Sequence, residues 1–470
     1  MAELDDTVMV VLGPNSMPFV VTSNNSSIDS ATRKLIRSHV MRGRNQGRTR
    51  PKRNVLVQGY DMAAGSVQAP SVNFDDITRI YMPPTRHIGP DLSFLASPAD
   101  LDPSILSNII KVSPIAQKVM YPLLTAVGKP VDNRQWIRLC MVDAAALHVT
   151  AFSVESFVDI FLHRRKQPNP AAMVHFQKGL TLLSERLAGG DEELKATDTS
   201  IGVVLKLATA AHFVGDLQVE RQHMIGVRKM VESRGGLDAF RFNPLLFEML
   251  RCDLVLSVPS TSIPVFFRQP LEPIPPYPVS LLPKFNGTAQ TQDTLEVAKM
   301  IDASLAEAWS IMRRFSLLVN LGTQTQRLIS TKVINETMTS VVYRLLDIRY
   351  PSGSLNEGVR LILLTYCFHV FLQWRDVKLP CPHLQNSFQE MTLALQHSGK
   401  VSARFMLWVL MVGAVSIFDS QNEGWLSSML RHHVRSQQIS WTEVQDVLKS
   451  FLWIPLLDEE PAKLIWDSLN

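Results

Sequence analysis

The chain has 470 residues, of which 46% are hydrophobic and 19% charged, and this composition excludes a mainly disordered chain. The four cysteines are too few and too scattered for a disulfide scaffold and favour a reducing, intracellular location. The net charge is +4, but residues 33–53 carry nine Lys or Arg and no acid. Subtracting those nine charges leaves −5 on the other 449 residues, so the positive excess lies in one short segment.

Residues 1–100 differ in composition from the rest of the chain. Two short apolar segments, Val8–Leu12 and Met17–Val21, predict either strands or segments that dock on a partner. Ser30 is a good N-cap for a helix over 31–42. From Arg44 to about Pro90 the chain is rich in Gly, Ser, Asn and Pro, which predicts a flexible linker. The acidic first residues do not fit a secretory signal.

The remainder of the chain has helical periodicity with one interruption. Eight prolines within residues 258–290 interrupt it and predict an extended connection between a half at 101–257 and a half at 291–470. We therefore predict an all-α, multi-helix bundle in two packed halves, preceded by a flexible N-terminal basic segment. The helices are expected at 103–127, 133–164, 171–188, 195–215, 219–234, 244–257, 292–320, 324–349, 355–375, 384–396, 401–418, 422–434, 441–452 and 461–468.

Two helix ends have specific sequence signals. Gly235-Gly236 can adopt positive φ and end the helix at 219–234. Gly226 inside that helix costs about 1 kcal/mol relative to Ala, which a closely approaching backbone would explain. Ser440 and Glu443 predict a capping box before the last buried stripe.

The longest uncharged apolar stretches, 361–374 and 405–418, are 14 residues each. A membrane-spanning helix needs about 20 residues, so these stretches predict core helices and no membrane span.

No sequence motif for catalysis or cofactor binding is found. The chain has no Gly-x-Gly-x-x-Gly, Walker, His-Glu-x-x-His or Gly-x-Ser-x-Gly pattern. Cys367-x-His369 and Cys381-x-His383 have poor spacing for zinc and favour structural roles. His212 and His223 lie close to Asp216 and Glu220, which could form an acid–base pair, but structural roles for both histidines are favoured. We therefore expect no enzyme activity, no cofactor and no metal.

The basic segment is the most informative feature for function. Its side chains suit nucleic-acid phosphates or the acidic groove of an import receptor, and a solvated tail without a partner is the third alternative. Any DNA contact from this segment alone would be weakly specific, because phosphate contacts carry no base information. The candidate contact residues are Arg37, Arg42, Arg44, Arg48, Arg50, Lys52 and Arg53.

Three stretches resemble a known family. Residues 223–237 (His-x-x-Gly-Val-x-x-Met-Val-x-x-Arg-Gly-Gly-Leu), with Asp253 after an apolar helix, resemble the middle of the fungal-specific transcription factor domain. Leu407–Leu410 and Ser440–Trp453 resemble its C-terminal half. Residues 36–42 (Ile-Arg-Ser-His-Val-Met-Arg) resemble the N-terminal motif of a fungal subgroup often labelled the tachykinin family.

The resemblance implies an all-helical regulatory domain in a nuclear protein. Many relatives carry a zinc binuclear cluster that needs six cysteines, and this chain has four, so sequence-specific DNA binding is placed in doubt. The leading hypothesis is a fungal nuclear transcription regulator. Its helical domain would bind protein partners or an effector, with a homodimer as one such assembly. Its basic segment would direct import or contact the DNA backbone. The alternatives are a helical interaction scaffold and an enzyme or small-molecule-binding protein with a pocket between the halves.

Overall fold

The computed structural model describes residues 9–12, 18–21, 103–128, 142–163, 165, 168–213, 215–268, 272–282, 292–375, 377–419, 423–437 and 439–469. The chain divides into two units, Met1–Ala69 and Pro70–Asn470. In the first unit, β1 (Met9–Leu12) pairs antiparallel with β2 (Pro18–Val21), with Met9 opposite Val21. Of the two expectations for these segments, strands are confirmed. The predicted helix at 31–42, the linker and the basic segment lie outside the described residues.

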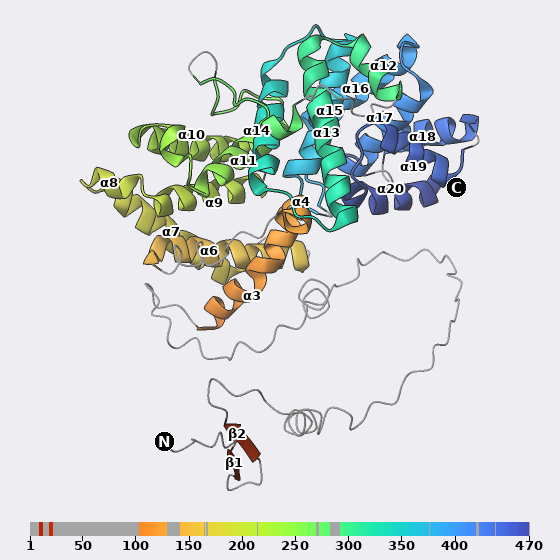
Figure 1. Ribbon diagram of the computed structural model, residues 1–470. Coiled ribbons are helices and arrows are strands. Elements are labelled where there is room, and N and C mark those ends of the chain that lie inside the picture. Colours follow the sequence, from red (N-terminus) through yellow and green to blue (C-terminus); the bar gives the residue numbers. More distant parts are fainter. Residues whose placement is uncertain are drawn as a thin grey trace, which may run out of the picture. The chain divides into compact units, whose positions relative to one another are not determined.

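The second unit is helical throughout its described part, which confirms the all-α prediction (Figure 1). Its helices before the proline-rich connection are α3 (Pro103–Met120), α4 (Pro122–Val127), α6 (Ala144–Phe157), η1 (Val158–Leu162), α7 (Pro170–Ala188), α8 (Glu192–Lys195), α9 (Asp198–Phe213), α10 (Leu217–Ser233), η2 (Leu237–Phe240) and α11 (Leu245–Ser257).

The described part of the proline-rich connection holds one short 3₁₀ turn, η3 (Val279–Leu281). The helices that follow are α12 (Gln292–Met300), α13 (Ala303–Thr325), α14 (Thr331–Asp347), α15 (Leu355–Cys367), η4 (Phe368–Leu372), α16 (Pro382–Ser398), α17 (Ala403–Ser416), α18 (Gly424–Gln437), α19 (Trp441–Ser450) and α20 (Pro455–Leu469).

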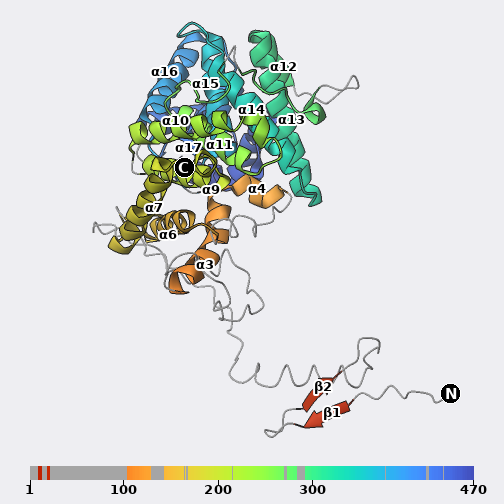
Figure 2. The same ribbon diagram turned by 90° about the vertical axis from the view of Figure 1, so that its left-hand side faces the viewer.

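One apolar core runs through both stretches of helices. It extends from Leu123 on α4 to Leu469 on α20 and includes the fully buried Trp309, Trp408 and Trp453. Helices α6 to α10 lie to one side and α15 to α20 to the other, with α11 and α14 in contact between them (Figures 1 and 2). The N-terminal helices connect the two sides, because α3 packs on α6 whereas α4 packs on α13 and α20.

The fully buried Asp253 anchors the proline-rich connection to α11. Its carboxylate accepts hydrogen bonds from the backbone N–H groups of Val265 (2.7 Å) and Phe266 (3.0 Å) and from the hydroxyl of Tyr343 on α14 (2.9 Å). Burial raises the pKa of Asp253 to about 6 although these hydrogen bonds act in the opposite direction. The residue that stood out in the family resemblance therefore has a structural role at the junction of α11, the connection and α14.

The predicted helix ends agree with the structure in detail. Gly235 and Gly236 have φ of 96° and 85°, and their N–H groups donate to Glu232 and Val231 in a Schellman arrangement. The Ser440–Glu443 capping box is formed. The expectation for Gly226 was wrong, because a Cβ placed there meets nothing within 4 Å.

Several predicted helices have different boundaries in the structure. The helix expected at 324–349 begins at Thr331, because α13 continues to Thr325, and the helix expected at 133–164 is interrupted at Asp143, which caps α6. The helix expected at 103–127 breaks at Tyr121, since Pro122 starts a new helix at its first position. The helix expected at 292–320 is divided by Asp302, whose side chain caps α13. The helix expected at 461–468 begins at Pro455, where the Asp458 carboxylate accepts a hydrogen bond from the N–H of Ile454 (2.6 Å).

One helical stretch in the described part, Leu355–Leu372, is long and apolar enough to cross a membrane by length and composition. Most of it is buried within the helical body, as is typical of a core helix.

Candidate functional site

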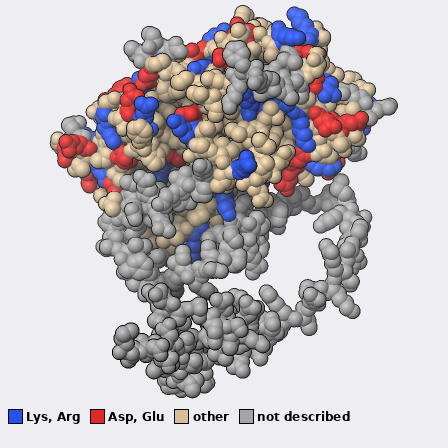
Figure 3. Space-filling view, viewed as in Figure 1, with Lys and Arg blue, Asp and Glu red and all other residues tan. Residues whose placement is uncertain are grey.

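The seven basic residues of the predicted contact segment, Arg37 to Arg53, lie outside the described residues. On the visible face of the helical body, Lys and Arg are interspersed with Asp and Glu (Figure 3). The account of the basic segment therefore rests on its sequence alone.

The two Cys-x-His pairs have structural contacts. The Nε2 atom of His369 lies 2.8 Å from a carboxylate oxygen of the buried Asp458, and its Nδ1 atom lies 2.6 Å from Oε1 of Gln373. Burial raises the pKa of Cys381 to about 12, and His383 contacts the Thr261 hydroxyl (2.8 Å). No group of three or more potential metal ligands is found among the described residues.

The side chains of His212 and Glu220 are within hydrogen-bonding distance between α9 and α10. Their Nδ1–Oε2 distance is 2.9 Å, and their side chains are 11% and 4% exposed. Asp216 does not join this pair, because its side chain caps α10 by accepting from the N–H of Val219. Burial lowers the pKa of His223 on α10. The pair therefore ties the two helices together, and it also borders the cavity described next.

A cavity of about 1570 Å³ lies in the described part of the helical body. Helices α3, α6, α9 and α11 supply most of its wall, and residues of α14 and η4 border it on the side of the second helical stretch. Most of the lining is apolar. Its size exceeds the ~300–1,000 Å³ of ordinary small-molecule pockets. The cavity therefore has room for a sizeable organic ligand.

Helical spacing determines which side chains reach this cavity. On α9, Gly202, Lys206 and Thr209 recur every three or four residues and share one face. On α11, Glu248, Cys252 and Val255 do the same. The two faces meet where the Thr209 hydroxyl lies 3.8 Å from the Cys252 sulfur.

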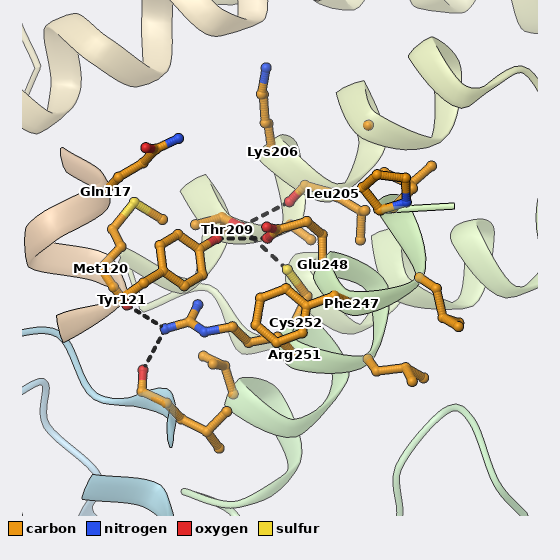
Figure 4. A pocket seen from close by; sticks show the side chains of 18 of the residues that line it. Gln117, Met120, Tyr121, Leu205, Lys206, Thr209, Phe247, Glu248, Arg251 and Cys252 are labelled. Carbon is orange, nitrogen blue, oxygen red and sulfur yellow. Dashed lines mark hydrogen bonds between the residues drawn. The ribbon is translucent and has the colours of Figure 1, made fainter. Parts of the chain in front are cut away.

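A polar cluster lies at the wall of the cavity where α3 ends against α11 (Figure 4). The Tyr121 hydroxyl donates a hydrogen bond of 2.6 Å to the Glu248 carboxylate. Burial, followed by the nearby Glu248 carboxylate, raises the pKa of Tyr121 well above its usual value. Tyr121 is therefore a neutral hydrogen-bond donor at physiological pH.

Arg251 forms the cationic part of this cluster. Its guanidinium lies 4.5 Å from the centre of the Tyr121 ring, and its residue is 4% exposed. Nη2 donates to the backbone carbonyls of Met120 (2.8 Å) and Leu372 (2.9 Å), which end α3 and η4. Helix C-termini carry partial negative charge, so these two ends stabilise the buried cation.

Cys252 is the one thiol at this cavity among the described residues, and its environment opposes reactivity. Burial and the Glu248 carboxylate raise its pKa to about 12. A thiol needs to be ionised to act as a nucleophile. Cys252 is therefore protonated at neutral pH, and the cluster is better suited to binding than to covalent catalysis.

A pocket between the halves was one of the sequence-based alternatives, without assigned residues. His212 and Glu220, which were interpreted as structural, border the cavity, whereas the residues of the polar cluster were not identified. No local motif joins the residues of this cluster, because Tyr121 lies more than 120 positions before Glu248 and Arg251. The one available signal was the pair of charged residues, Glu248 and Arg251, one turn apart in a mainly apolar helix that also carries Asp253.

Comparisons with known proteins find no matching family model, no similar curated protein and no similar solved structure. The resemblance to the fungal-specific transcription factor domain therefore stays a prediction from the quoted residues.

Proposed function

We propose that this protein is a nuclear transcription regulator whose helical body is a small-molecule-binding regulatory domain. The observation that carries the proposal is the large, mainly apolar cavity with a polar cluster at its wall. Such a combination is typical of ligand sites, where apolar walls provide affinity and a few polar groups fix orientation. The nuclear role rests on the basic segment 33–53 and on the family resemblance.

The contacts of the polar cluster favour binding over bond-making. Glu248 is held by the Tyr121 hydroxyl, and the Cys252 thiol is protonated, so neither offers an activated base or nucleophile. Regulation by a ligand would follow from the position of the cavity. A ligand there contacts helices before and after the proline-rich connection, and so it would stabilise their packing by mass action.

Two glycines allow a matched test of the cavity. A Cβ at Gly202 meets nothing within 4 Å, and Gly202 lines the cavity, so Gly202→Trp would project into it. Gly226 on α10 is equally unobstructed but does not line the cavity, which makes Gly226→Trp the control. Both changes replace a mid-helix glycine, so both folds are expected to persist.

The assay is the fluorescence of Nile red, a neutral apolar dye, titrated into the purified full chain. We expect saturable binding to the wild type, binding weakened by about tenfold or more in Gly202→Trp, and unchanged binding in Gly226→Trp. The absence of saturable binding, or equal binding by both variants, would contradict a ligand cavity.

Import is tested separately with the fluorescently tagged full chain. Replacing all seven candidate basic residues by Gln is expected to abolish nuclear accumulation. The matched control replaces seven exposed cations of the helical body, namely Lys178, Lys229, Lys299, Lys400, Arg431, Arg435 and Lys449. Equal nuclear accumulation of the wild type and of the variant with the seven Gln replacements would contradict an import role for the basic segment. A DNA affinity that does not change with salt would remove the phosphate-contact role.

A further inference from the structure

We infer that the cavity takes an amphipathic organic anion, with one carboxylate bound at Arg251 and an apolar body along the wall formed by α9 and α11. This inference rests on the proposed function, because it names the ligand class of the same site. It follows from three features of the cluster: the partners of the guanidinium, the covering of its faces, and the chemistry of the surrounding wall.

The guanidinium retains unused hydrogen-bond donors. Nη2 uses its two hydrogens on the carbonyls of Met120 and Leu372. Within the described part of the chain, the N–H groups on Nη1 and Nε have no hydrogen-bond partner, and Nε is buried. A buried cation with unused donors is stabilised strongly by an ionised acceptor.

No carboxylate of the described residues forms an ion pair with Arg251. Helix α11 carries two acids near Arg251: Glu248 accepts from the Tyr121 hydroxyl, and Asp253 accepts from Val265, Phe266 and Tyr343, and neither makes an ion pair with the guanidinium. The helix ends at Met120 and Leu372 supply only partial negative charge. These partial charges stabilise the guanidinium in part and leave a full counter-charge to the ligand.

Arg313 is a second buried arginine, and comparing it with Arg251 shows which contacts are structural. Arg313 also donates to two backbone carbonyls, those of Lys449 and Phe451, and carries no acid partner among the described residues. Carbonyl contacts of this kind are therefore structural in this fold. Arg251 differs because it borders the cavity and Arg313 does not.

The surroundings of Arg251 define the rest of the ligand. The Tyr121 ring covers one face of the guanidinium, so an acceptor approaches along its edge. Leu205, Phe247 and Val255 provide apolar wall near the cluster on α9 and α11. Lys206 extends away from the cluster in Figure 4, and its ammonium contacts Thr150 on α6. A single anionic head with an apolar chain matches this distribution.

The test compares three ligands of equal chain length, decanoate, decan-1-ol and decylamine, by calorimetric titration of the full chain at neutral pH. We expect decanoate to bind about 10- to 100-fold more tightly than decan-1-ol, and decylamine to bind most weakly. Equal or tighter binding of the alcohol or the amine would overturn the inference while leaving a small-molecule cavity in place. If none of the three ligands binds and Nile red does not bind either, the proposed function fails as well.

Variants place the anion at Arg251. Arg251→Met is expected to remove the preference for decanoate and to keep decan-1-ol binding within about threefold, whereas Arg251→Lys retains part of the preference. A preference for decanoate that persists in Arg251→Met would overturn the assignment of the anchor. Should Arg251→Met not fold, the Gly202→Trp variant decides the location, because decanoate binding that is unchanged in it places the ligand elsewhere.

Discussion

Acidification should destabilise the helical body through a pair of buried histidines on α6 and α7. His148 and His175 are 5% and 7% exposed, their rings are stacked, and their Nδ1 atoms are 3.0 Å apart. One Nδ1 donates and the other accepts, so a second proton would place two donors against each other. Burial, the partner ring and Lys178 lower the pKa of His148, and burial and Lys178 lower that of His175, with Glu155 opposing.

The sign follows from linkage. The pKa values of both histidines in the folded chain lie below the ordinary value. As pH falls, the unfolded chain therefore binds protons at these histidines before the folded chain does. The stabilisation is complete above about pH 6.5 and is lost as pH falls through the folded pKa values. Between pH 7.5 and 5.5 each histidine can remove at most about 1.4 kcal/mol, so the pair removes up to about 2.7 kcal/mol.

The assay is urea unfolding of the wild type and of the double variant His148→Leu/His175→Leu at both pH values. Two apolar groups of similar size replace both hydrogen-bonding partners, so the variant is expected to fold at pH 7.5. Asp253, whose pKa is raised to about 6, acts with the opposite sign, but it is present in both proteins and cancels in the comparison. We expect the wild type to lose up to about 2.7 kcal/mol more than the variant. An equal loss in both would refute the reasoning.

Three further measurements, by thermal unfolding, urea unfolding and thiol labelling, have expected outcomes. In thermal unfolding, Gly202→Ala should stabilise the chain by about 0.5–1 kcal/mol, whereas Gly413→Ala should destabilise it, because its Cβ would lie 2.8 Å from the Phe388 ring. Ser440→Ala should cost about 1 kcal/mol in urea unfolding through loss of the capping box, and an unchanged midpoint would contradict this. Cys252, with its pKa raised to about 12, should react slowly with iodoacetamide at pH 8 until urea is added, and rapid native labelling would contradict this raised pKa.

Local signals predicted much of the fold. Three predictions that depend on neighbouring residues are confirmed: the all-α class, the capping box at Ser440, and the positive φ of Gly235 and Gly236. The break at Tyr121 was missed, because apolar periodicity continues across it and Pro122 is tolerated at a helix start. The role expected for Gly226 was wrong, because helical periodicity does not report which elements pack against each face.

The candidate site was beyond sequence reasoning for a physical reason. The position of the Arg251 guanidinium depends on hydrogen bonds to the carbonyls of Met120 and Leu372, which lie 131 and 121 positions away in the sequence. Tertiary packing brings these groups together, and no periodic pattern encodes such contacts. The basic segment presents the reverse case, since its charge is evident from sequence and its structural context lies outside the described residues.

The most direct test of the ligand cavity is a crystal structure of the full chain grown with bromine-labelled dodecanoate. The account predicts an anomalous bromine peak inside the cavity and a carboxylate within hydrogen-bonding distance of the Arg251 guanidinium. A cavity occupied by the protein's own side chains, or a bromine peak found only on the outer surface of the helical body, would contradict it.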